Sequence, residues 1–125
     1  MNNRGGRTLE LLELRSYGGE EYSNSELNAV LGAGDRVIVH AFLNGVTGTN
    51  PALVLKAEDS SDAENWANLG TVITTGTINA GSDIPSVWRG VVDFPHGRFL
   101  RLKTEISGTG AVSVTMNVRA SIKNA

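Results

Sequence analysis

The sequence contains no cysteine, which excludes disulfide bridges, thiolate metal sites and cysteine nucleophiles. It also lacks any apolar run near the roughly 18 residues that a membrane-spanning helix needs. The first fifteen residues do not carry the continuous apolar stretch of a secretion signal. We therefore expect a soluble protein that is made in a cytoplasm and folds by packing alone.

The chain has little excess charge of either sign. Eleven Lys and Arg residues stand against 13 Asp and Glu, which gives a formal net charge of −2 over 125 residues, and the charges are interspersed. Without a basic field, attraction to nucleic acid or to anionic membrane is not expected. The length fits one domain with its own core. We predict no nucleic-acid partner and no membrane partner.

Period-two alternation is the strongest pattern present. Apolar and polar side chains alternate through residues 112–123, and a similar alternation runs through 98–107, where Leu100 and Leu102 point inward. The SGTG stretch at 107–110 lies between these runs and predicts a hairpin turn, because glycine accepts the positive φ of tight turns.

Further strands are expected along most of the chain. Residues 24–31 fit either a strand or a short helix, and we favour the strand. With them the count is about eight, which predicts an all-β fold: an antiparallel two-sheet β-sandwich of jelly-roll or Greek-key type over residues 8–125, after a flexible, extended arm at 1–7. The remaining strands are expected at 8–15, 36–44, 52–59, 70–75 and 86–94.

Two of these segments depart from simple alternation. Residues 36–44 are apolar at almost every position, which indicates a strand that is covered on both sides or that packs one face against a partner. In 8–15, Leu9 and Leu11 alternate in one phase, whereas Leu12 and Leu14 follow in the other. A strand there must bulge, or pass to another sheet or subunit.

The acidic stretch EDSSDAENW at 58–66 does not have the ligand spacing or the central glycine of a helix-loop-helix calcium loop. We interpret it as the turn after a strand, in which Asp and Ser side chains bond to nearby backbone amides. An adventitious calcium site stays open as an alternative. Trp66 then packs over the edge of the sandwich, and a role as a sugar platform is the alternative.

Catalytic patterns are poor. The two histidines are His40, within an apolar strand, and His96, in a turn, and no Gly-x-Ser-x-Gly motif is present. We predict a protein that is not an enzyme and that uses no cofactor and no metal.

Two features favour binding to a partner. Three arginines, Arg89, Arg98 and Arg101, lie near the aromatic residues Trp88 and Phe99 in the sequence. Arginine and aromatic side chains are enriched at the hot spots of protein interfaces. An ordinary solvent-exposed sheet face, with pairs such as Arg101 or Lys103 with Glu105, is the alternative. The second feature is the polar arm MNNRGGR, which could order against an acidic partner.

From Arg36 onward, about two-thirds of the chain resembles small structural proteins of tailed bacteriophages. The resemblance rests on a V-x-G-T-x-P turn at 46–51, an acidic turn ending in W-x-x-L-G at 61–70, G-R-F-x-R-L at 97–102 and S-G-T at 107–109. It implies a jelly-roll head decoration (cement) protein on the outer capsid surface of the virion, with the major capsid protein as partner and a homo-oligomer, dimer or trimer, as the assembled form. For this function we predict a partner interface at Arg4, Arg7, Leu9, Leu11, Trp88, Arg89 and Arg101.

Other functions remain open. Similar chains also serve as tail or neck accessory proteins. From a different class, a carbohydrate-binding β-sandwich module would use exposed aromatic side chains, and the candidates are Trp66, Trp88, Tyr17 and Tyr22.

Overall fold

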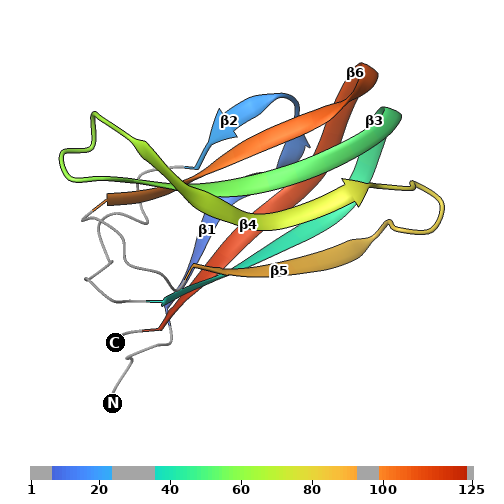
Figure 1. Cartoon of the computed structure of the whole chain (residues 1–125). Helices are drawn as coiled ribbons and strands as arrows, with labels where there is room; N and C mark the ends of the chain where they lie inside the picture. Colours follow the sequence, from blue (N-terminus) through green and yellow to red (C-terminus); the bar gives the residue numbers. More distant parts are fainter. Residues whose placement is uncertain (1–6, 24–35, 93–98, 124–125) are drawn as a thin grey trace.

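The computed structural model describes residues 7–23, 36–92 and 99–123. These residues form six strands and no helix, and every strand pairing is antiparallel. Among them there is accordingly no helix that is long and apolar enough to cross a membrane. The strands are β1 (Arg7–Tyr17), β2 (Glu20–Tyr22), β3 (Arg36–Ser60), β4 (Ala67–Thr77), β5 (Ser86–Val92) and β6 (Phe99–Lys123) (Figure 1).

The two long strands, β3 and β6, organise the fold. They have 25 residues each and pair with one another from Arg36 opposite Lys123 to Ser60 opposite Phe99. Both bend at the same end of the molecule, at the upper right of Figure 1, so that each contributes to two layers. The β1 layer has the order β1, β6 (113–123), β3 (36–47) and β5, and the β2 layer has the order β2, β6 (99–107), β3 (52–60) and β4.

Glycines allow the bend. Gly48 in β3 has φ 92° and Gly108 in β6 has φ 142°, which are conformations that side chains with a Cβ rarely adopt. A Cβ on Gly48 or Gly108 would also come within 3 Å of atoms of Val112. The β3–β6 register shifts repeatedly between Leu43 and Ala52, so the corner is built from bulges that increase bending.

The core lies between the layers, because alternate residues of every long strand point inward. Val37 and Val39 of the β1 layer and Leu53 and Leu55 of the β2 layer are fully buried and belong to one hydrophobic cluster. Among the described residues no buried side-chain nitrogen or oxygen lacks a hydrogen-bond partner. A buried polar group without a hydrogen bond would cost free energy, so the satisfied core supports the stability of a chain that has no disulfides.

The predicted bulge in the first strand is confirmed. The β1–β6 register shifts between Glu10 and Leu12 and again between Leu12 and Arg15. As a result Leu11 and Leu12 are both buried, whereas Leu14 is 59% exposed.

The prediction of a hairpin at 107–110 is wrong. The runs 99–107 and 112–123 do not pair with each other; they are the two halves of β6 and both pair with β3. The segments 36–44 and 52–59 are likewise halves of one strand, so the described residues hold six strands where about eight were expected. The physical reason is that a glycine with positive φ permits a corner as readily as a tight turn.

The short strand β2 was not expected, and residues 24–31, with the choice between strand and helix, lie outside the described residues.

Candidate functional site

Aromatic and charged side chains gather on the outer face of the β2 layer. Leu100 and Leu102 are buried, so the alternation of β6 turns Arg101 outward. Glu58 lies directly opposite Arg101 in the β3–β6 register. We call Tyr22, Glu58, Trp66 and Arg101 the Arg101 cluster.

The Arg101 guanidinium holds this cluster together. Its Nε and one terminal nitrogen lie 2.9 and 2.8 Å from Oε1 of Glu58. Its central carbon lies 3.9 Å from the centre of the Tyr22 ring and 4.2 Å from that of Trp66. The guanidinium is therefore fixed by an ion pair and by two cation–π contacts, and both rings are fixed against it.

Ion pairs continue along the same face. Lys103 Nζ lies 3.4 Å from Glu20 and 3.3 Å from Glu105, and Lys56 Nζ lies 3.1 Å from Glu105. The hydrogen bond to Glu105 raises the pKa of Lys103, and the hydrogen bond from Lys56 lowers the pKa of Glu105. The predicted pairing of Lys103 with Glu105 is confirmed, whereas Arg101 pairs with Glu58 instead.

The acidic stretch at 58–66 is the end of β3, to Ser60, followed by a hydrogen-bonded turn, as predicted. Asp62 Oδ1 accepts the backbone amides of Glu64 and Asn65 at 2.9 and 2.8 Å, and Ser60 Oγ accepts those of Asp62 and Ala63. The amide of Asn65, followed by that of Glu64, holds the pKa of Asp62 well below its usual range. The described residues contain no group of three or more potential metal ligands. The turn delivers Trp66, half-buried, onto the guanidinium of Arg101.

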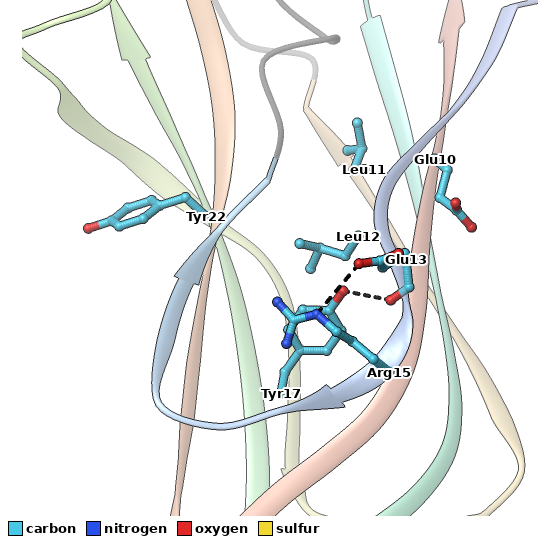
Figure 2. A pocket seen from close by; sticks show the side chains of 7 residues that line it. All are labelled: Glu10, Leu11, Leu12, Glu13, Arg15, Tyr17 and Tyr22. Carbon is cyan, nitrogen blue, oxygen red and sulfur yellow. Dashed lines mark hydrogen bonds and ion pairs between the residues drawn. The ribbon is translucent and has the colours of Figure 1, made fainter.

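A groove of about 380 Å³ lies between β1 and β2, and Tyr22 of the Arg101 cluster is one of the residues that line it (Figure 2). Leu11 and Leu12 point into it, and Arg15 bridges the two strands by a 2.6 Å bond to Glu21. Tyr17 is 1% exposed and donates its hydroxyl to the backbone oxygen of Glu13 at 2.6 Å, and its burial raises its pKa. Because Tyr17 is buried in the core, its ring is not available as a sugar platform.

The structure separates the residues that were predicted to form one partner interface. Leu9 and Leu11 are 9% and 2% exposed and belong to the core of the same chain. Trp88 lies opposite inward-facing Ala41, packs against the core and donates Nε1 to Ser86 Oγ at 3.1 Å.

The predicted arginines also lie apart. Arg89 is exposed on β5, in the β1 layer, whereas Arg101 lies on the outer face of the β2 layer, so the two do not share a patch. Arg7 is the first residue of β1, and Arg4 lies outside the described residues.

Sequence reasoning did not find the partnership of Tyr22, Glu58 and Arg101. The alternation of β6 shows that Arg101 points outward, but only the register of β3 against β6 places Glu58 beside it, and the two residues are 43 positions apart.

No protein-family model matches the chain, and no curated protein is significantly similar to it. Among solved structures it is similar to the CBM22-1 xylan-binding domain of Paenibacillus barcinonensis Xyn10C. That similarity extends over 100% of both chains, with a TM-score of 0.59 and 15% sequence identity. At this identity the similarity shows the fold alone. The chain has an all-β, antiparallel β-sandwich fold like that of the CBM22 domain.

Proposed function

We propose that this chain is a non-enzymatic structural protein of a tailed-phage virion, of the decoration (cement) type, that binds the outer surface of the assembled head. The observation that carries the proposal is the Arg101 cluster. Trp, Tyr and Arg are the residue types enriched at the energetic centres of protein interfaces, and here Trp66, Tyr22 and Arg101 lie together on one sheet face. Their mutual contacts hold them in place before binding, which lowers the entropy cost of association.

Two further observations support this function. The sequence from Arg36 onward resembles phage structural proteins, which include jelly-roll decoration proteins. Counting the halves of β3 and β6 separately gives eight segments in two rows of four, and this count supports the jelly-roll type that the proposed function implies.

The function asks for a simple mechanism. A protein that binds the assembled lattice, and not the loose capsid subunit, stabilises the lattice by mass action. An oligomer that engages several subunits at once gains further from effective concentration. The expected partner is the major capsid protein, and neither step requires catalysis or a cofactor.

The test is co-sedimentation with empty, expanded heads. Tyr22→Ala and Trp66→Ala should each weaken head binding by about 30-fold or more, the loss typical of a hot-spot side chain. Thr74→Ala is the matched control, because Thr74 is exposed on β4 of the same layer and lies outside the Arg101 cluster. Wild-type binding by both aromatic variants would contradict the assignment of this face.

A carbohydrate-binding module is the second candidate, and the similarity to the xylan-binding domain favours it over the first. On this function the rings of Tyr22 and Trp66 would contact a sugar. The position of Arg101 argues against this function, because its guanidinium already lies over the rings of Tyr22 and Trp66, where a sugar would have to stack. Retardation of the protein in gels that contain xylan, lost in Trp66→Ala, would support this candidate. Retardation by a glycan together with no binding to heads would replace the first candidate with the second.

A further inference from the structure

The outer face of the β1 layer carries opposite charges at its two edges. One row crosses all four strands in register: Glu10 of β1 lies opposite Arg119 of β6, Arg119 opposite His40 of β3, and His40 opposite Arg89 of β5. Glu10, Arg89 and Arg119 are exposed. Within the described part of the chain, neither arginine takes part in an ion pair. The row therefore begins with an acid and ends with a base.

The neighbouring row is apolar at both edges. Phe42 lies opposite Asn117 of β6 on one side and Val87 of β5 on the other, and Leu14 of β1 lines a shallow groove with Phe42 and Asn117. Leu14 and Val87 are each 59% exposed. Exposed apolar side chains that are grouped on one sheet face are a feature of interaction surfaces.

We propose that this face binds a second copy of the same chain, as a symmetric dimer. A two-fold axis that runs parallel to the strands exchanges the edges, so β1 of one copy lies over β5 of the other. Glu10 then faces Arg89 of the second copy, and Leu14 faces Val87 of the second copy. Both contacts are complementary, and each occurs twice in the dimer.

The interior of the face is compatible with this arrangement. Asn117 comes to lie over Phe42 of the second copy, and Arg119 over His40 of the second copy, where the planar guanidinium can stack on the ring. Glu10 already has an interaction within its own chain, and a carboxylate has lone pairs for a further donor. A two-fold axis that lies in the interface but runs perpendicular to the strands would place each strand over the same strand of the second copy. Both complementary contacts would then be lost.

The face is large enough for a stable dimer. Four strands at a spacing of about 4.8 Å and seven residues at about 3.3 Å span roughly 20 by 23 Å. This is about 460 Å² for each copy, and the uneven surface of the side chains brings the total area buried by two copies to about 1,000 Å². That area is the lower limit of specific interfaces. Two twisted sheets that pack face to face with nearly aligned strands are a common arrangement.

Sedimentation velocity of the purified chain tests the dimer without heads or glycans, so its outcome is independent of the proposed function. Wild type should sediment as a dimer at micromolar concentration. Val87→Glu should raise the dimer dissociation constant about tenfold or more, because it places a charge against Leu14 of the second copy. Thr74→Glu introduces the same charge at an exposed residue of the other layer and should leave the dimer unchanged.

A charge exchange tests the pairing itself. Glu10→Arg and Arg89→Glu should each weaken the dimer about tenfold, and the double variant should return to within about threefold of wild type, because opposite charges face each other again. Within one chain the two residues are three strand spacings apart, roughly 14 Å, so rescue cannot arise inside a monomer. Thermal unfolding midpoints near that of wild type would show that all variants fold. A monomer at every concentration to about 100 µM, a trimer, or a dimer indifferent to these changes would overturn the proposal.

Discussion

Arg101 and Glu58 face each other across the β3–β6 pair, and two guanidinium nitrogens of Arg101 lie 2.8 and 2.9 Å from the same carboxylate oxygen. The pair joins the middle of the β2 layer to the rings of Tyr22 and Trp66. Hydrogen bonds between ionised groups are shorter and stronger than neutral ones, so this pair fixes the geometry on which the proposed binding face depends.

Replacing Glu58 tests this role. Glu58→Gln removes the negative charge from a carboxylate that is 13% exposed, and we expect the free energy of unfolding to fall by about 1 to 3 kcal/mol. Urea denaturation measures the change. Glu20→Gln is the control, because Glu20 is 60% exposed and surface pairs contribute about 0 to 1 kcal/mol. Equal losses in the two variants would mean that Arg101 is not held by Glu58.

The bulge in β1 predicts a large effect on stability for one leucine of this strand and almost none for another. Leu11→Ala empties a site that is 2% exposed and should cost about 2 to 5 kcal/mol of unfolding free energy. Leu14→Ala, at 59% exposure, should stay within about 0.5 kcal/mol in the monomer. Urea denaturation at protein concentrations below the dissociation constant of the proposed dimer measures both changes in unfolding free energy. A large loss at Leu14 with little at Leu11 would contradict the observed phase of the strand.

The corner of the long strands depends on Gly48. Gly48→Ala combines a φ of 92° with a Cβ that would lie 2.9 Å from Val112 Cα, so we expect a loss of about 1 to 3 kcal/mol. Gly110→Ala separates the two causes, because Gly110 has φ 83° but no atom within 4 Å of an added Cβ. Thermal unfolding should show the larger loss for Gly48→Ala. The same loss in both variants would show that contact with Val112 does not matter.

Asp62 should make stability depend on acid pH. Its folded-state pKa lies below the ordinary value of 3.8, so its stabilising contribution is fully present above about pH 5 and is lost as pH falls below that value. Asp62→Asn should therefore lower the unfolding midpoint at pH 7, and the gap from wild type should close towards pH 2. Circular dichroism melts across this range measure it. A gap that does not change with pH would show that the carboxylate is not the origin of the effect.

Alternation in the sequence predicts which side chains of a long strand point inward, but it does not predict which strand pairs with which. Alternation is local, so the inward placement of Leu100 and Leu102 could be predicted from residues 98–107 alone. The doubled phase at Leu11 and Leu12 likewise revealed the bulge, because no unbroken strand buries two adjacent side chains on one face.

Pairing depends on contacts between distant segments, and there the sequence was insufficient. The glycines at 108 and 110 fit a hairpin as well as a corner, and only the register shows that both halves of β6 run along β3. The Arg101 cluster draws on β2, β3, β6 and the turn before β4, so no motif of fixed spacing could have predicted it. Arg89 and Arg101 are only 12 positions apart in the sequence, but they lie in different layers because β5 and the first half of β6 pair with different halves of β3.

The most direct test of the proposed function is co-sedimentation of the purified chain with empty, expanded heads of the phage to which the chain is proposed to belong, with copies per head counted across a range of salt concentrations. We predict saturable binding at a simple fraction or multiple of the capsid subunit number, and its loss in Trp66→Ala but not in Thr74→Ala. A chain that remains in the supernatant at every salt concentration would contradict the assignment to the head and turn attention to the tail and to glycans.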